Sequence, residues 1–247
     1  MVSSASALER AREAAHTAGD YVGQESFMRA SEILELGRRA GIDDGTRILD
    51  LCCGIAGPGR HLARTFGCSY LGVDRSEAAL RVARDRARGL PCTFLVQEVP
   101  PVPAGPFEVV LLLETMLAFA AKEPLLRGIA DALAPGGRFA CTLEAGPPLT
   151  ESERQRMPGA DAVWLTPLET MRTMLQEVGL TVRWEDDLTS AHHDVAAALL
   201  RAYEQGSASI RVEIGSAEAD ALVTAHAVWV DWLSSGRVRK FALVAER

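Results

Sequence analysis

The chain has 247 residues, 48% of them hydrophobic, which suits one large globular domain or one domain with a substantial insertion. Its formal net charge is −7, and its pI is near 5.3. A protein that grips a phosphate backbone without regard to sequence needs a basic face, so this acidic balance argues against nucleic acid as a partner.

The N-terminus and the cysteines bear on the compartment. Residues 1–16 read as polar and helix-like, without the apolar segment of a secretory signal. The longest apolar stretch, residues 109–121, is interrupted by Glu114 and is too short to span a bilayer, so no membrane partner is expected. The five cysteines are odd in number and lack paired Cys-x-x-Cys spacing. These features favour a reduced, cytoplasmic protein.

Strand and helix patterns alternate through the first 145 residues. Apolar residues at helical spacing predict two helices first, and short buried strands then alternate with helices. In chain order, the predicted elements are helices over 8–16 and 25–40, a strand over 46–51, a helix over 59–66, a strand over 69–74, a helix over 76–89, strands over 92–97 and 106–114, a helix over 124–133 and a strand over 138–145.

The rhythm changes beyond residue 145. The later elements are a long polar loop or lid over 146–167, a helix over 168–179, a strand over 180–187, helices over 191–205 and 216–235, and a last strand over 238–246. Strands that alternate with helices at this spacing predict the α/β class, with a doubly wound parallel sheet. The right-handed crossover rule leaves few topologies for such a sheet.

The stretch ILDLCCGIAGPG, residues 48–59, reads as a buried strand that enters a glycine-rich turn before a helix. Such a turn at the carboxyl edge of a parallel sheet is the usual ligand crevice, because glycines let backbone N–H groups approach a ligand closely. A phosphate-binding loop is not predicted, since no Gly-Lys-Ser/Thr follows. A dinucleotide fingerprint is imperfect, since Cys52 occupies its first glycine position and Ala56 its third.

Asp74 ends the predicted strand over 69–74 and follows Asp50 by 24 residues. An acidic residue at this place can accept hydrogen bonds from both hydroxyls of a ribose. The alternative is a charge that stabilises the N-terminus of the following helix, and it is compatible with ribose binding. Together, the turn and Asp74 suit an adenosine whose sugar Asp74 holds, and they suit a pyrophosphate poorly.

Four segments in order resemble the motifs of the class I S-adenosylmethionine-dependent methyltransferases. They are ILDLCCGIAGPG, LGVDRSEAAL, FEVVLLLETMLAF and LAPGGRFACTLE, within residues 46–146. YVGQESF, residues 21–27, is similar to a segment that folds over the cofactor in small-molecule members, among them amine N-methyltransferases and isoprenoid-diphosphate C-methyltransferases. The resemblance implies a Rossmann-like, doubly wound, mostly parallel seven-stranded sheet with an antiparallel last strand, a helical N-terminal lid and inserted acceptor-site helices.

The expected organisation is a single domain of three parts. Residues 1–40 are expected to form the lid, and residues 41–146 the S-adenosylmethionine-binding core. Residues 147–247 are expected to supply the acceptor-binding segment and to complete the sheet.

The resemblance implies S-adenosylmethionine as the cofactor and S-adenosylhomocysteine as its product. Cys52 departs from the family's usual glycine, and a small side chain there fits if its φ is negative. Cys53 matches a position where cysteine is common, and the pair lacks a second Cys/His pair to close a tetrahedral site, so no metal is expected. The implied cofactor-binding residues are Tyr21, Gln24, Asp50, Cys52, Gly54, Asp74, Arg75, Gln97, Glu98 and Glu114.

Several of these residues have a structural alternative. Tyr21 and Gln24 either close over the sulfonium, where an aromatic face attracts a cation, or belong to a core helix. Glu98 either touches the adenine amine or is an exposed loop carboxylate. Glu114 interrupts an apolar strand, and a buried charge is costly unless it is partnered. It either balances the sulfonium or orients the acceptor, or it pairs with a neighbouring arginine.

The acceptor site is expected outside the shared motifs. A histidine poised near neutral pH suits a general base, although a histidine pair at a helix start is also typical of surface capping. Trp229 and Trp232, three residues apart, also fit a helix core. The candidate catalytic residues are Glu114, Glu144, His192 and His193, and the candidate substrate-binding residues are Trp164, Tyr203 and Trp229.

The predicted function is methyl transfer by in-line displacement to a small-molecule metabolite, in secondary metabolism, by a monomer or homodimer. Residues 147–240 hold nine Arg or Lys against fourteen Asp or Glu, which favours a neutral or cationic acceptor. C-methylation of an isoprenyl diphosphate alkene stays open, because Arg154, Arg156, Arg172 and Arg201 offer a local site for the diphosphate. A cofactor-bound cyclase or binding protein without methyl transfer, and a nicotinamide oxidoreductase, also stay open.

Overall fold

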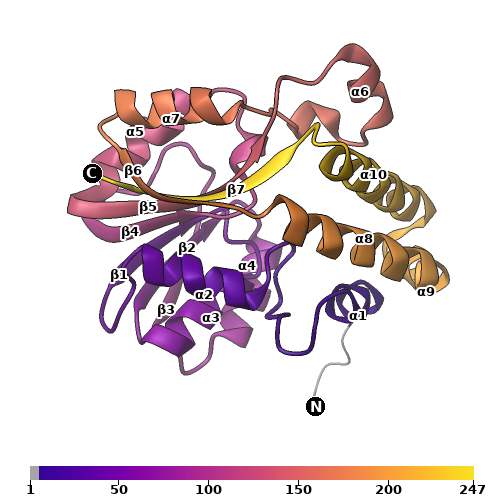
Figure 1. Ribbon diagram of the computed structural model, residues 1–247. Coiled ribbons are helices and arrows are strands. Elements are labelled where there is room, and N and C mark those ends of the chain that lie inside the picture. The colour runs from indigo at the N-terminus through magenta and orange to yellow at the C-terminus, as the bar shows by residue number, and fades with distance from the viewer. Residues whose placement is uncertain (1–5) are drawn as a thin grey trace.

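A seven-stranded sheet runs through the middle of the molecule, between two layers of helices (Figure 1). The computed structural model describes residues 6–247. The strands lie in the order β3-β2-β1-β4-β5-β7-β6. Their bounds are β1 Arg47–Leu51, β2 Ser69–Asp74, β3 Cys92–Val96, β4 Phe107–Leu112, β5 Leu133–Ala145, β6 Thr181–Asp187 and β7 Arg239–Glu246.

The strand directions confirm the predicted sheet. Strands β1 to β5 pair in parallel, with the order reversing beside β1, where β2 lies on one side and β4 on the other. The last strand, β7, inserts between β5 and β6 and is antiparallel to both. The chain is therefore Rossmann-like, and the reversal beside β1 places a ligand crevice at the end of that strand.

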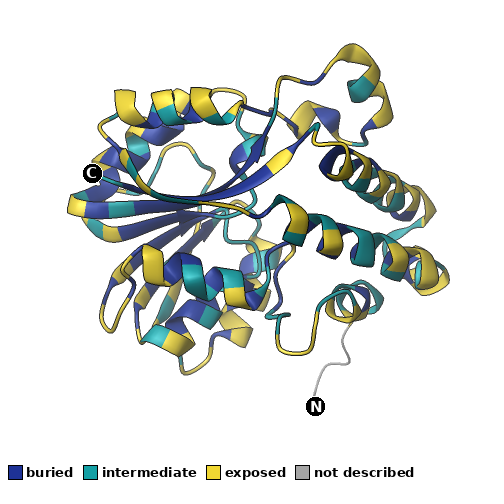
Figure 2. Ribbon diagram, viewed as in Figure 1, coloured by how far each residue is buried: buried dark blue, intermediate teal, exposed yellow. Residues whose placement is uncertain are grey.

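Two apolar cores flank the sheet because the strand side chains alternate between its faces. On one face the core is closed by α2 (Ala30–Arg39), α3 (Gly57–Phe66) and α4 (Glu77–Arg86). On the other it is closed by α5 (Lys122–Ala132) and α7 (Leu168–Glu177). Figure 2 shows the inner strands β1, β4, β5 and β7 as largely buried, whereas the edge strands β3 and β6 are not.

A further group of helices stands beside the edge at which the parallel strands end (Figure 1). This group packs around its own apolar cluster, which contains Leu199, Tyr203 and Leu233. Its members are α1 (Ala7–Ala14), α8 (Thr189–Gln205), α9 (Ser207–Ile214) and α10 (Ser216–Ser234). No helix in residues 6–247 is long and apolar enough to cross a membrane.

The N-terminal segment differs from the prediction. A helix was expected over 25–40, but α2 begins at Ala30, and the residues before it form a loop. Gln24 explains the loop, because its Nε2 donates to the carbonyl oxygens of Asp20 and Met28 at 2.8 and 2.9 Å. The helix then starts where the Arg29 N–H donates to the Glu32 carboxylate, a partner for one of the free amides of the first turn.

Two segments are more ordered than the sequence predicts. The expected loop over 146–167 contains α6 (Glu151–Arg156) and the 3₁₀ turn η2 (Ala160–Ala162). Helix α6 begins after Thr150, whose Oγ1 caps the helix by accepting the N–H of Glu153. Helix α9 was not predicted. A second 3₁₀ turn, η1 (Met116–Ala118), follows β4.

Candidate functional site

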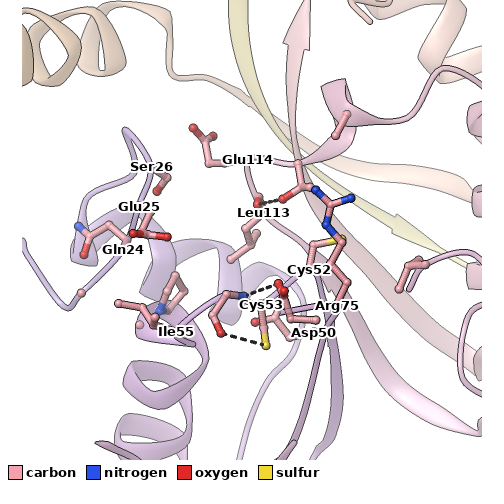
Figure 3. Close-up of a pocket in the computed structure, with 18 of the residues that line it drawn as sticks. Gln24, Glu25, Ser26, Asp50, Cys52, Cys53, Ile55, Arg75, Leu113 and Glu114 are labelled. Atoms are coloured by element: carbon pink, nitrogen blue, oxygen red, sulfur yellow. Dashed lines mark hydrogen bonds between the residues drawn. The ribbon is translucent and has the colours of Figure 1, made fainter. Parts of the chain in front are cut away.

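A cavity of about 510 Å³ opens at the carboxyl ends of β1, β2 and β4 (Figure 3). Its walls come from the turn between β1 and α3, from the end of β2, from the residues after β4, and from the N-terminal segment. The lining residues are Gly23, Gln24, Glu25, Ser26, Asp50, Cys52, Cys53, Gly54, Ile55, Gly57, Pro58, Asp74, Arg75, Gln97, Glu98, Val99, Leu113, Glu114, Thr115, Ala118, Phe119 and Ala162.

Three non-glycine residues in the described chain have a positive φ: two of them line the cavity, and the third lies in the turn between β1 and α3. They are Cys52, Ala56 and Glu114, with φ of 59°, 55° and 57°. The condition under which a side chain at position 52 fits easily, a negative φ, is therefore not met. The chain must turn sharply out of β1 and again into α3, and both reversals use the left-handed region that glycine occupies at no steric cost. Each such residue costs roughly 1–2 kcal/mol, and strain of this kind concentrates at functional sites.

The start of α3 has no side chain where the N-terminal segment crosses it. A Cβ atom on Gly57 would lie 2.4 Å from the carbonyl oxygen of Gly23. A Cβ on Gly59 would lie 2.0 Å from the ring of Tyr70. The bare backbone at Gly57 lets the N-terminal segment rest on the turn, and at Gly59 it lets α3 pack against the ring of Tyr70.

Asp74 connects the two strand ends. Its Oδ2 accepts the backbone N–H of Gly54 at 2.8 Å, and its Oδ1 accepts the N–H of Ser76 at 2.8 Å. A carboxylate has about four lone-pair sites, so each oxygen keeps one for a further donor. The two hydrogen bonds fix this carboxylate in place. Because Asp74 also lines the cavity, its free lone pairs can accept hydrogen bonds from a ligand.

Asp50, at the end of β1, is buried and hydrogen-bonded. Its Oδ2 accepts the hydroxyl hydrogen of Tyr70 at 2.6 Å. Burial raises the pKa of Asp50 to about 7, because the low-dielectric surroundings outweigh that hydrogen bond, and the nearby charge of Asp74 adds to the shift. Asp50 therefore anchors the turn and titrates near neutral pH.

The two adjacent cysteines are neutral thiols. Burial raises the pKa of Cys52 to about 12, and it raises the pKa of Cys53 further still. A thiol with a raised pKa is a poor metal ligand and a poor nucleophile. Within residues 6–247, no group of three His, Cys, Asp or Glu side chains is placed to hold a metal ion.

Glu114 follows β4 and is tied to the neighbouring strands. Its N–H donates to Thr142 Oγ1 at 2.5 Å, and its Oε2 accepts from Lys240 Nζ at 2.6 Å. Lys240 Nζ also donates to Glu144 Oε1 at 2.5 Å. The partner of Glu114 is thus a lysine on β7, not the neighbouring arginine considered as the alternative.

Nine of the ten predicted cofactor-binding residues line the cavity; Tyr21 does not. Its ring lies 5.5 Å from that of His16, and burial raises its pKa to about 12. Gln24 lines the cavity, but its amide is occupied by the backbone of its own segment, so it shapes the lid. Gln97 donates to the carbonyl of Pro101 at 2.6 Å. Binding by these residues stays a prediction.

The two predicted histidines lie outside the cavity. His192 is fully buried on α8, and its Nε2 lies 3.1 Å from Glu32 Oε2. His193 faces a shallow surface hollow that Asp187 and Arg239 also line. Their role as general bases stays a prediction, and the geometry gives His192 a structural partner.

The predicted acceptor-site aromatic residues do not line the cavity and contact other side chains. Trp229 makes edge contacts with Phe27 and Trp232, at ring distances of 6.3 and 5.4 Å. The ring of Tyr203 lies 4.8 Å from that of His226. Trp164 is 38% exposed and stacks under the Arg154 guanidinium. Substrate binding by these three residues stays a prediction.

The sequence analysis missed several cavity residues and one buried cation. Glu25 and Ser26 project from the N-terminal segment, as Figure 3 shows, and Thr115 and Phe119 lie beyond β4. The sequence analysis gave no role to Lys240. Its signal was available, because it is one of only two lysines and it interrupts an apolar strand.

Comparison with known proteins identifies the segment that carries the site. Residues 48–137 match a family model described as a methyltransferase domain. Methyltransferase GfsG of Streptomyces halstedii is 32% identical over 112 residues, 43% of this chain and 40% of that protein. Phosphoethanolamine N-methyltransferase 1 of Arabidopsis thaliana is 28% identical over 163 residues, 63% of this chain and 33% of that protein. The matches thus cover well under two thirds of these relatives.

Solved structures share the fold at low sequence identity. Haemonchus contortus phosphoethanolamine N-methyltransferase 2, in complex with S-adenosyl-L-methionine, has a TM-score of 0.79 at 21% identity, covering 96% of this chain and 56% of that one. The cyclopropane synthase MmaA2 of Mycobacterium tuberculosis has a TM-score of 0.81 at 11% identity, covering 92% of this chain and 88% of that one.

Proposed function

We propose that the chain, whose residues 48–137 match a methyltransferase domain, belongs to the S-adenosylmethionine-dependent methyltransferases and transfers the methyl group of S-adenosylmethionine to a small-molecule acceptor. The observation that carries the proposal is the position of the Asp74 carboxylate at the cavity wall. This carboxylate is held between the N–H groups of Gly54 and Ser76, and it keeps acceptor capacity toward the cavity. This arrangement suits the two hydroxyls of a ribose.

The other walls also fit the donor. Gly54 lies in the turn beside Asp74, and Asp50 faces the same cavity from the end of β1. Gly57 leaves room for the N-terminal segment to cross the turn, which closes the cavity over a bound nucleoside. We propose that Asp74 holds the ribose, that Glu98 and Arg75 flank the adenine, and that Asp50 and Glu114 lie toward the amino-acid end.

When bound, S-adenosylmethionine supplies an electrophilic methyl group, whose bond to sulfur breaks with both electrons left on sulfur as the acceptor forms its new bond. The protein then has no new anion to stabilise. Its contribution is alignment and the exclusion of water, and alignment alone supplies ~7–11 kcal/mol in favourable cases. The lid of residues 21–29 and the segment with η2, whose Ala162 lines the cavity, perform this task.

The charge of the cavity bears on the acceptor. Five carboxylates line it, and Arg75 is the one Arg or Lys among the described lining residues. This supports an acceptor that is cationic or neutral, such as an amine or an alcohol. Of the arginines considered for a diphosphate, Arg156 pairs with Asp231 and Arg172 with Glu185, outside the cavity. Methylation of an isoprenyl diphosphate is therefore the less supported candidate.

Calorimetry with S-adenosylhomocysteine and with NADH tests the proposal. We expect tight binding of the first and none of the second, and the reverse order would overturn the assignment. Incubation with radiolabelled S-adenosylmethionine and a metabolite extract tests transfer. A labelled product supports the proposal, whereas retained cofactor without any product would replace it with a cyclase or a binding protein.

We also propose that the protein works in the cytoplasm and in secondary metabolism. Support for the compartment comes from the cysteines, which are all free thiols. Support for the pathway class is limited to the small-molecule character of the proposed acceptor.

A further inference from the structure

Glu114, Glu144 and Lys240 form a buried ion cluster beside the cavity. The side chains of Lys240 and Glu144 are 1% and 2% exposed, and that of Glu114 is 11% exposed. Lys240 Nζ lies 2.6 Å from Glu114 Oε2 and 2.5 Å from Glu144 Oε1. The residues come from three neighbouring parts of the sheet, the end of β4, β5 and β7, so the sheet itself assembles the cluster.

The ion cluster has one more negative charge than positive. Burial favours the neutral forms, but the Lys240 ammonium outweighs it and holds the pKa of Glu114 below its ordinary value. Burial alone would lower the pKa of Lys240, but the carboxylates of Glu114 and Glu144 outweigh burial and raise this pKa above its ordinary value. One ammonium between two carboxylates leaves a net charge of −1.

Within the described chain, no hydrogen bond compensates the excess charge, and Lys122 is a second ammonium on which the Glu144 carboxylate acts. Glu114 Oε1 and Glu144 Oε2 are both buried and accept no hydrogen bond. The backbone of Glu114 is fixed, because Thr142 holds its N–H, and its side chain is held by Lys240. An uncompensated buried charge is costly, so a cation in contact with the cluster would be stabilised strongly.

Glu114 belongs to both the ion cluster and the cavity. It lines the cavity together with Asp74 and Asp50, and Figure 3 shows its side chain reaching toward the N-terminal segment. The methyl donor has a sulfonium between its ribose and its amino-acid end, whereas the product has a neutral sulfur there. The two ligands are otherwise alike, so the cluster acts on the one feature that differs between them.

We propose that the buried ion cluster makes this site prefer the cationic methyl donor over its neutral product, with Lys240 and Glu144 as positioning residues that set the preference through Glu114. The inference rests on the proposed function and deepens it. As a consequence, when the methyl group leaves the donor, its sulfur becomes neutral and loses the positive charge that the cluster stabilises. The product is then bound less tightly than the donor, which favours its release.

Calorimetric titration of the same protein with S-adenosylmethionine and with S-adenosylhomocysteine, at one pH and ionic strength, tests the inference. The quantity to compare is the ratio of the two dissociation constants. Glu144→Gln keeps the shape of the side chain and makes the cluster neutral. We expect this variant to lose about tenfold of the preference for the donor, mainly through weaker donor binding. Glu114→Gln should move the ratio in the same direction.

Glu108→Gln is the matched control, because it removes one negative charge from the same strand, where Glu108 pairs with the exposed Arg47. It should leave the ratio unchanged. An unchanged ratio in Glu144→Gln and Glu114→Gln would overturn the inference while leaving the proposed function intact. Binding of neither ligand to the unaltered protein would overturn the proposed function itself.

Should the glutamine variants fail to fold, the unaltered protein still decides the matter. It should bind the donor more tightly than the product, and because the cluster is buried, that preference should change little with salt concentration. Equal affinities, or tighter binding of the product, would contradict the inference.

Discussion

Gly57 and Gly23 lie so close that a Cβ atom on Gly57 would be 2.4 Å from the carbonyl oxygen of Gly23. The contact joins the first turn of α3 to the N-terminal segment across more than thirty residues of sequence. It is a backbone contact, so neither side can yield by rotating a side chain. The close packing of the N-terminal segment on the turn therefore requires a residue without a Cβ atom at position 57.

Gly57→Ala should open this contact. Overpacking of this kind costs about 1–3 kcal/mol, and here the strain falls on the docking of the segment, so we expect roughly a tenfold or greater loss of affinity for S-adenosylhomocysteine. Calorimetry measures the affinity, and limited proteolysis over residues 20–29 measures the opening. Gly128→Ala on α5 is the control, because its Cβ would meet only the Val102 side chain at 3.0 Å. Equal affinities for the two variants would show that the contact is not needed.

Asp74→Ala should weaken binding of S-adenosylhomocysteine severely, by about a hundredfold or more. The variant removes the proposed acceptor of two ribose hydroxyls and also frees the Gly54 N–H, and each charge-assisted hydrogen bond contributes about 1.5–3 kcal/mol. Asp85→Ala on α4 is the control, since Asp85 pairs with Arg88 on an exposed surface. A dissociation constant that Asp74→Ala leaves unchanged would remove Asp74 from the site.

The strand ends that position Asp74 could be read from the sequence, and the ion cluster could not. Asp50 and Asp74 each close an apolar run that leads into a helix, and both strands end at the same edge of a parallel sheet. Lys240 is 126 residues from Glu114 and 96 from Glu144. Their contact requires β7 to insert beside β5, an order that local patterns do not specify.

Other residues show the same limit. His192 opens a predicted helix and reads as a surface cap, yet α8 packs against the start of α2 and buries it beside Glu32. The positive φ of Cys52 also has no local signal, because a cysteine in place of the first glycine favours a negative φ and only the folded turn imposes the positive one. Burial and backbone strain are properties of the assembled fold.

Cys52→Gly should stabilise the ligand-free protein by about 0.5–1 kcal/mol. Glycine removes the penalty of the left-handed conformation at Cys52, and this gain exceeds the extra freedom that glycine gives the unfolded chain. Cys53→Gly makes the same chemical change one residue later, where φ is not positive, and it should destabilise the protein. Urea unfolding measures both. If both variants shift the urea midpoint in the same direction, backbone strain at Cys52 does not explain the effect of Cys52→Gly on the stability of the protein.

Asp50 should make stability fall as pH rises toward neutrality. Its pKa is about 7 in the folded protein against an ordinary 3.8, so the folded state binds the extra proton between these values. The contribution is full below about pH 4 and is lost as pH rises to about 7, a change of about 4 kcal/mol for this group. The free energy of unfolding of Asp50→Asn, measured against pH, should lack this fall. Parallel pH profiles for the two proteins would assign the titration elsewhere.

Both lysines of the chain are buried, which makes the native surface unreactive toward amine-directed reagents. Lys122 is 4% exposed and donates to the carbonyls of Phe119 and Trp164, each at 2.7 Å, and Lys240 is 1% exposed in the ion cluster. Burial lowers the pKa of Lys122 to about 8, so its unprotonated fraction is adequate for acylation and access alone protects it. An acylating reagent should leave both lysines unmodified in the native protein and should modify both after unfolding in urea. Peptide mass mapping distinguishes the sites. Rapid modification of Lys122 in the folded protein would mean that its contacts to Phe119 and Trp164 open readily, and with them this wall of the cavity.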